Sequence, residues 1–435
     1  MNGCYRIGAV LPNSDLKHIW GFADRSLVLW YKADKISSAW GRSKEGGAMA
    51  KFRILSLDGG GTWALIQVMA LMDIYGADAT GHEVLRHFDL VAANSGGSIV
   101  LGCLVENMPL SQTLAFFLSL EKRKSIFVEK FHLPYTPKYK TVVKFKGLQA
   151  SLPQRGEWLL PQAAADIPSA NTNRPVHLLI IGFDYDRNCA RFFRSAPATG
   201  AAWGNGDAAQ VRLVEAIHAS TTAPVLYFDK PAKFPSEPAR RYWDGAVTGC
   251  NNPVLAAVTE AIVLGHAPDA VAALAIGTGT VSCPPAPAGA PPEVFYATRE
   301  EPGILPDALK LASAIVDDPP DVASFLVHVL TGGQDGVPAP ADSRVVRMSP
   351  MISPVRNAAG DWTLPQGMNV DQFSVLANLA MDAVKQEQVL AIQMLAQLWL
   401  DDHVRNQPIR MNGNLKLELG QDWYSQAKAA WKTIQ

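Results

Sequence analysis

The sequence has 435 residues, of which 48% are hydrophobic and 18% charged, and its net charge is −1. Such a composition supports a large buried core and excludes a chain that is disordered throughout. The balanced charge provides no overall field to recruit nucleic acid, so no nucleic-acid partner is expected.

Cysteine spacing and hydropathy exclude further classes of protein. The five cysteines are scattered without a C-x-x-C pair, which predicts neither a disulfide framework nor a zinc site. The first residues lack the basic start and continuous apolar run of a signal peptide. The longest apolar stretch, which begins near Ser98, is interrupted by Glu106 and Asn107, so no membrane-spanning segment is expected. We therefore expect a cytoplasmic protein.

The predicted elements begin at Lys51, after an N-terminal extension (residues 1–50) to which no role is assigned. Phe52–Leu57 is an apolar run typical of a buried strand. It is followed by the glycine triplet at 59–61 and then by residues 63–75, which lack Gly and Pro and are apolar on nearly every face. This second segment indicates a buried helix.

Three further apolar runs, at residues 88–94, 176–184 and 271–276, have the composition of buried strands. Because these runs alternate with helical segments and are apolar throughout, they predict an α/β protein with a mainly parallel central sheet covered on both faces.

Two regions are less regular. Residues 122–155 carry nine Lys or Arg against one acid, with aromatic residues interleaved. They are interpreted as part of a cap or lid, either solvated and mobile or able to dock on anionic lipid surfaces. The proline-rich residues 283–294 predict a loop, and residues 304–330 and 370–402 predict a helical C-terminal part.

Ser95 carries the sharpest local signal. It stands in the string Ala93-Asn94-Ser95-Gly96-Gly97, between a strand and a helix, with residues 95–97 expected as a tight turn and the helix from Ser98. Small neighbours at such a turn expose a nucleophilic hydroxyl at a helix N-terminus. Taken alone, the string also fits a simple turn.

Two other strings could complete a catalytic site. The amides of Gly59, Gly60 and Gly61 could converge on an oxyanion or a phosphate, or the triplet could be a structural turn. Asp244, before Gly245, could accept the serine proton, although Asp-Gly is also an ordinary turn. None of the nine histidines lies in a small-residue loop after a late strand, and an aspartate base is chemically adequate if it is held close to the hydroxyl.

Together and in this order, these strings resemble the patatin-like phospholipase family. The matching strings are Leu57-Asp58-Gly59-Gly60-Gly61, Ala93-Asn94-Ser95-Gly96-Gly97 and Asp244-Gly245-Ala246, supported by residues 219–224, 251–253 and 276–279. The similarity runs from about Lys51 to Thr280.

The resemblance implies a three-layer α/β/α fold and lipid acyl hydrolase activity without a metal or organic cofactor. Ser95 would be the nucleophile, Asp244 the base, and the Gly59, Gly60 and Gly61 amides the oxyanion hole. The expected partners are a lipid or ester substrate and, transiently, a membrane surface. The expected domains are a catalytic domain at 51–300, with the cap or lid within 122–170, and the helical part at 301–435.

Two departures from the family pattern are visible. Ala93 stands where the family usually has Gly, and Trp63-Ala64 replace a usual Arg-Gly pair. The alternatives are a non-catalytic binding or scaffold protein with this fold and, from Asp58-Gly59-Gly60-Gly61-Thr62, an actin-like sugar kinase. In such a kinase the first strand would turn into a β-hairpin.

Overall fold

The computed structural model describes residues 51–133, 136–195, 210–286, 319–333, 343–409 and 419–434, together with 295–297, 301–303, 307 and 310. The N-terminal extension, most of the proline-rich segment and most of residues 304–318 lie outside these ranges, so the expectations for them are not addressed by the structure.

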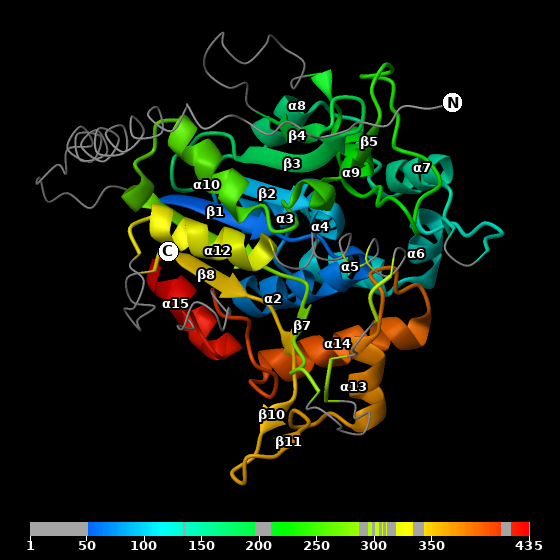
Figure 1. Cartoon of the computed structure of the whole chain (residues 1–435). Coiled ribbons are helices and arrows are strands. Elements are labelled where there is room, and N and C mark those ends of the chain that lie inside the picture. The colour runs from blue at the N-terminus through cyan, green and yellow to red at the C-terminus, as the bar shows by residue number, and fades with distance from the viewer. Residues whose placement is uncertain are drawn as a thin grey trace, which may run out of the picture. The chain divides into compact units, whose positions relative to one another are not determined.

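A seven-stranded sheet forms the centre of the described chain, with strand order β4-β3-β2-β1-β6-β8 and β5 paired to β3 (Figure 1). Five strands run parallel: β1 (Phe52–Leu57), β2 (Leu90–Asn94), β3 (His177–Asp184), β6 (Val271–Ile276) and β8 (Val345–Met348). Strands β4 (Cys189–Arg194) and β5 (Tyr242–Asp244) pair antiparallel with β3. The four predicted strands and the mainly parallel sheet are confirmed.

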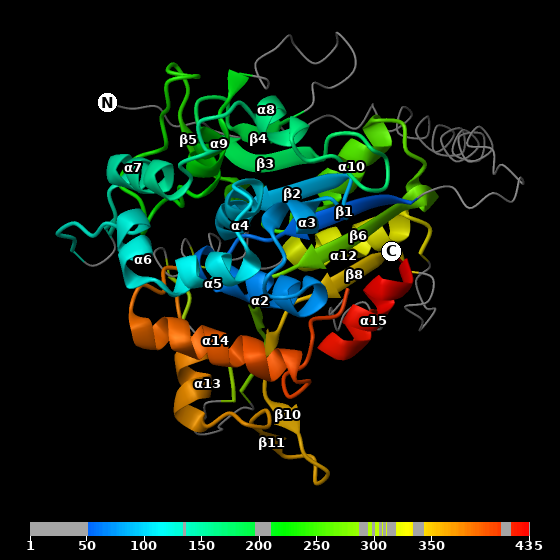
Figure 2. The same ribbon diagram turned by 180° about the vertical axis from the view of Figure 1, so that it is seen from behind.

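Side-chain alternation along the strands divides the core into two layers. In β1, Leu55 and Leu57 join one apolar cluster, whereas Phe52 and Ile54 join the other. Because successive side chains of a strand point to opposite faces, each face must be covered by helices. The first layer contains α2 (Leu65–Tyr75), α4 (Ser95–Val105), α5 (Leu110–Leu118) and α9 (Leu213–Ser220), and the second contains α10 (Val254–Val263) and α12 (Pro319–Leu330) (Figure 2). The fold is a three-layer α/β/α sandwich.

The connection after β1 separates this fold from the sugar-kinase alternative. Strand β1 is followed by a short 3-10 turn, Gly61–Ala64, and then by α2, as the apolar run predicted. It pairs in parallel with β2 and β6 and has no hairpin partner. Two short helices, α3 (Gly81–Leu85) and α8 (Leu160–Ala165), lie in the connections that lead into β2 and β3.

The C-terminal region is more than a set of helices. It supplies β8 to the central sheet, which the sequence analysis did not anticipate, and the short strands β9 (Met351–Ile352), β10 (Val355–Arg356) and β11 (Trp362–Thr363). The predicted helical stretch 370–402 is divided into α13 (Val370–Ala377) and α14 (Gln386–Leu400), and α15 (Tyr424–Ile434) follows. Helices α14 and α15 bury residues in the first apolar layer.

The break between α13 and α14 has a tertiary cause, since it contains neither Gly nor Pro. The carbonyl of Met381 accepts a hydrogen bond from the Thr62 amide at 3.1 Å. The carbonyl of Ala380 accepts one from Nε1 of Trp63 at 3.3 Å. These bonds hold the segment against the start of α2.

The basic stretch also forms ordered structure. It contains α6 (Leu120–Ile126) and α7 (Thr141–Ser151), which pack against each other and against α5 and α9. Arg123 is 3% exposed and Lys144 is 0% exposed, so the charges of this stretch are not all solvated. Within the described ranges, no helix is long and apolar enough to cross a bilayer.

Candidate active site

Ser95 lies at the junction of β2 and α4, buried at the carboxyl edge of the parallel sheet. Its φ is +45°, a left-handed conformation that is strained for a residue other than glycine. The Ser95 amide donates to Oγ of Ser220 at 2.9 Å, which helps to hold this conformation. The helix begins at Ser95 itself, so the tight turn expected at 95–97 is instead the first turn of α4.

Asp244 ends β5 and meets Ser95 from the neighbouring part of the sheet. Its side chain is 2% exposed, and its amide donates to the Thr222 carbonyl at 2.8 Å. Its Oδ1 accepts hydrogen bonds from the Ala246 amide at 2.9 Å and from Nδ2 of Asn94 at 3.4 Å. The Ser95 side chain lies close enough to this carboxylate to lower its pKa. The structure therefore brings together the two residues that the sequence selected.

The environment of Asp244 changes its acidity. Burial raises the pKa of the carboxyl to about 6, against the opposing effects of hydrogen bonds from Ala246, Ser95 and Asn94 and of the charge of Lys144. The group is therefore ionised at neutral pH, yet it is a stronger base than an exposed aspartate.

One segment at the end of α9 contacts both candidate catalytic residues. Oγ of Ser220 accepts a hydrogen bond from the Ser95 amide and donates one to Oδ1 of Asn94 at 3.3 Å. The Thr222 carbonyl accepts a hydrogen bond from the Asp244 amide. The buried Lys144 joins this segment, and its Nζ donates to His218 O, Thr221 Oγ1 and Thr222 Oγ1 at 3.0, 2.9 and 2.6 Å. No local signal in the basic stretch distinguished Lys144 from its exposed neighbours.

The glycine triplet forms a loop between β1 and the turn that precedes α2. The Gly59 amide donates to the Asn251 carbonyl at 2.9 Å, and the Gly59 carbonyl accepts from Oγ1 of Thr278 at 2.7 Å. The Gly59 amide therefore holds the loop and is not available to an oxyanion. Within the described residues, the amides of Gly60 and Gly61 have no acceptor.

Close packing joins this loop to the serine turn. A Cβ atom at Gly96 would lie 2.4 Å from the Gly61 carbonyl oxygen, and one at Gly97 would lie 2.5 Å from the Leu57 carbonyl oxygen. A Cβ atom at Gly59 would lie 3.0 Å from Cβ of Ser95. Glycine is thus required at positions 96 and 97 so that the serine turn can meet the backbone of residues 57–61, and at position 59 to leave room for neighbouring side chains.

An apolar pocket opens beside Ser95. It is lined by Gly61, Ser95, Gly96, Ile99, Ile126, Phe127, Thr221, Ala223, Tyr227, Phe228 and Met381. Met381 comes from the C-terminal region, which therefore contributes to the site. No histidine is among the lining residues.

Trp63 and Ala64, the pair that departs from the family pattern after the glycine triplet, belong to the core. Both are buried, and the Trp63 indole is directed to the Ala380 carbonyl. Trp63 therefore joins the glycine loop to the C-terminal segment.

Comparisons with known proteins show which proteins this chain resembles. Residues 55–258 match the family model described as patatin-like phospholipase. The chain is 28% identical over 215 residues to an intracellular phospholipase A2 of Caenorhabditis elegans, a match that covers 49% of this chain and 17% of that protein. VipD from Legionella pneumophila aligns over 80% of this chain and 67% of its own, at 10% identity and a TM-score of 0.34, which is too low to support an argument.

The close approach of the two turns makes Gly96 a test position. We expect Gly96→Ala to lower the free energy of unfolding by about 1–3 kcal/mol through overpacking. Hydrogen exchange across the glycine loop should accelerate, because the Gly61 carbonyl must move. Urea unfolding and exchange measured by mass spectrometry check both effects.

Gly76→Ala is the matched control. A Cβ atom there meets nothing within 4 Å, so only the cost of its left-handed backbone, φ +98°, remains. An equal exchange rate in the glycine loop of both variants would contradict the packing argument.

Proposed function

We propose, on the premise that residues 55–258 form a patatin-like phospholipase domain, that the chain is a serine acyl hydrolase acting on carboxylic esters of lipids. The observation that carries the proposal is the strained Ser95 next to the buried Asp244, beside an apolar pocket. Backbone strain at a serine, a neighbouring buried carboxylate and an apolar recess rarely coincide at a purely structural turn.

In the proposed mechanism, Oγ of Ser95 attacks the ester carbonyl carbon while Asp244 takes its proton. The tetrahedral intermediate collapses, the leaving alcohol receives that proton, and the acyl group stays on Ser95. Water then attacks the acyl-enzyme, again giving its proton to Asp244, and the fatty acid leaves as Ser95 is reprotonated.

The proposed oxyanion hole consists of the Gly60 and Gly61 amides. Both belong to the loop that packs on the serine turn, and the Gly61 backbone borders Gly96. Preorganised amides of this kind stabilise a developing negative charge, and one donor is typically worth about 10²–10³ in rate.

The substrate class follows from the pocket. Its lining is largely aliphatic and aromatic, which suits an acyl chain whose ester carbonyl lies at Ser95. The name of the C. elegans relative, a phospholipase, supports lipid esters as the substrate.

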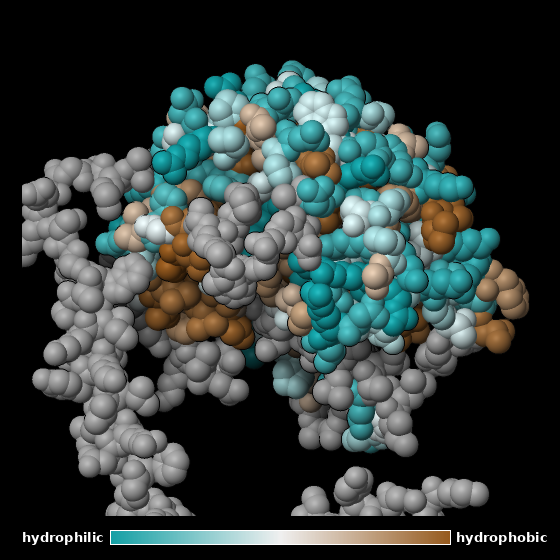
Figure 3. All heavy atoms as spheres, turned by 90° about the horizontal axis from the view of Figure 1, so that it is seen from above, coloured by the Kyte–Doolittle hydropathy of each residue, from teal (hydrophilic) through white to brown (hydrophobic). Residues whose placement is uncertain are grey.

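We further propose that the segment 127–140 docks on a membrane surface. It borders the pocket, since Phe127 lines it and the Lys138 and Tyr139 amides donate to the carbonyls of residues 226 and 227. Phe131 and Leu133 in this segment are 91% and 60% exposed. Figure 3 shows apolar residues at the right-hand edge, the side on which α6 and α7 lie in Figure 1.

Nearby charge favours anionic lipid as the surface. Three exposed lysines lie near this segment: Lys124 on α6, Lys140 directly before α7, and Lys146 on α7. Each basic residue near an anionic surface adds about 1 kcal/mol to binding.

Removal of either proposed catalytic side chain is the direct test. We expect Ser95→Ala and Asp244→Asn each to reduce hydrolysis of p-nitrophenyl esters, from acetate to palmitate, by at least about 10³-fold. The comparison variant Ser151→Ala should keep full activity, because that buried hydroxyl bonds only to the Gly147 carbonyl of its own helix. Full activity in Ser95→Ala would exclude the site, and inactivity of the unaltered chain on esters and vesicles would favour a scaffold.

The pH dependence identifies the base. Because Asp244 acts only when ionised, kcat/KM should fall as the pH drops through about 6, the raised pKa of this group, and be level above it. Burial also raises the pKa of Asp58 to about 6, so the acid limb should be steeper than that of one ionisation. A level profile down to pH 4.5, with the fold intact by tryptophan fluorescence, would argue against Asp244.

Membrane docking is tested with the double variant Phe131→Asp/Leu133→Asp. Its binding to vesicles of phosphatidylcholine and phosphatidylserine should weaken by at least about tenfold, since each apolar side chain contributes roughly 1.5–3 kcal/mol when buried. Hydrolysis of p-nitrophenyl acetate should not change. Leu390→Asp, at a position 51% exposed on α14, is the control. Equal binding by both variants would rule out this surface.

A further inference from the structure

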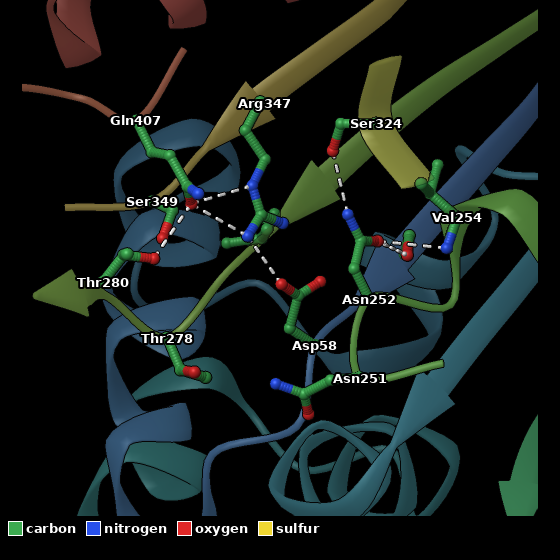
Figure 4. A network of polar contacts seen from close by, with 12 residues as sticks. Asp58, Asn251, Asn252, Val254, Thr278, Thr280, Ser324, Arg347, Ser349 and Gln407 are labelled. Carbon is green, nitrogen blue, oxygen red and sulfur yellow. Dashed lines mark hydrogen bonds and ion pairs between the residues drawn. The ribbon is translucent and has the colours of Figure 1, made fainter. Parts of the chain in front are cut away.

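The aspartate that begins the glycine loop is paired with a buried arginine from another part of the sheet (Figure 4). Oδ2 of Asp58 lies 2.7 Å from Nη2 of Arg347 in β8, and both side chains are 3% exposed. Strand β6 lies between β1 and β8, so the guanidinium reaches across a full strand at the carboxyl edge. The ion pair therefore joins the site to a strand far along the chain.

Arg347 is itself held in one position. Its Nε and Nη2 donate to Oε1 of Gln407 at 3.3 and 3.1 Å, and its carbonyl accepts from Nδ2 of Asn406 at 2.9 Å. Gly277 leaves room for the guanidinium, because a Cβ atom there would lie 2.6 Å from Nη2. Figure 4 shows the side chain lying between Gln407 and Asp58. A planar donor fixed in this way defines a direction as well as a charge.

The ion pair with Arg347 is one of several contacts that hold the start of the glycine loop. The Asp58 amide donates to the Ile276 carbonyl at 3.1 Å, and its carbonyl accepts from Nε2 of Gln67 at 2.9 Å. Gly59 uses its amide and its carbonyl on Asn251 and Thr278. The Gly60 carbonyl accepts from the Trp63 amide at 3.1 Å, but the amides of Gly60 and Gly61 make no such bond in the described residues. The orientation of these two amides therefore follows from the anchors before and after them.

We propose that Arg347 is a positioning residue of the site: its ion pair with Asp58 fixes the glycine loop so that the Gly60 and Gly61 amides point at the substrate oxyanion. The inference rests on the proposed function. It also places part of the active-site machinery outside residues 55–258, the range that the family model matches.

Four variants of the pair bear on this role. Arg347→Met and Asp58→Asn each leave the other charge buried without a partner, which can prevent folding. The double variant Asp58→Asn/Arg347→Met removes both charges and is expected to fold, since a buried ion pair is often replaced by neutral groups without loss of stability. Arg347→Lys keeps the charge but not the planar fork.

A control ion pair separates positioning from general stability. Arg194 of β4 donates to Oε1 of Glu260 in α10 at 2.9 Å, and this contact lies away from the glycine loop. Arg194→Met therefore breaks a strand-to-helix ion pair without touching the proposed site.

We expect the double variant to lose about 10–100-fold in kcat on p-nitrophenyl esters with KM nearly unchanged, because an oxyanion contact acts in the transition state. Arg347→Lys should recover part of the loss, and Arg194→Met should match the unaltered chain. Amide hydrogen exchange over residues 58–62 should accelerate in the double variant only.

A folded double variant with unchanged kcat would overturn the proposal, and so would an equal loss in Arg194→Met. If the unaltered chain shows no Ser95-dependent hydrolysis, the proposed function fails, and the exchange measurement then decides the positioning role. Unchanged exchange over residues 58–62 in the double variant would reject it.

Discussion

The site depends on the close approach of two turns at the carboxyl edge of the parallel sheet. The loop after β1 and the turn after β2 meet through backbone atoms, with Leu57, Asp58 and Gly61 on one side and Gly96 and Gly97 on the other. Adjacent parallel strands bring their ends to the same edge, and glycine lets the two chains touch. This contact sets the glycine-loop amides beside Ser95.

Buried polar groups fix the geometry around that contact. The buried side chains of Asn94 and Ser220 link the serine turn to β5. Asn94 donates to Asp244, Ser220 donates to Asn94, and Ser220 accepts a hydrogen bond from the Ser95 amide. Burial raises the pKa of two carboxyl groups, Asp58 and Asp244, to about 6. Both are therefore ionised at neutral pH but become protonated at a higher pH than an exposed aspartate. Burial therefore makes Asp244 a stronger base, while Asp58 stays ionised at neutral pH with Arg347 as its partner.

The sequence predicted those parts that rest on local pattern. Phe52–Leu57 and Val271–Ile276 are uniformly apolar runs of strand length, and their bounds agree with the structure. The start of α4 was placed wrongly because Gly96 and Gly97 suggested a tight turn before the helix, whereas the structure needs them for contact within its first turn. Strand β8 is only four residues long and contains Arg347, so neither hydropathy nor period distinguished it.

The local sequence pattern does not mark residues whose role depends on tertiary contacts. Lys144 and Arg347 look like surface basic residues in the sequence, and only the fold shows that they are buried. The break near Met381 likewise follows from bonds to residues more than 300 positions away. In the sequence, the proposal that Ser95 acts with Asp244 rests on several weak strings that occur in one order.

Covalent labelling of the nucleophile tests the central claim most directly. A fluorophosphonate probe forms a bond from a serine Oγ to its phosphorus with loss of fluoride, and peptide mass spectrometry then locates the label. We predict labelling at Ser95 alone in the unaltered chain and a loss of at least about 10²-fold in labelling rate in Asp244→Asn, because the hydroxyl then lacks its base. Labelling at another serine, or an equal rate in Asp244→Asn, would contradict a Ser95–Asp244 dyad.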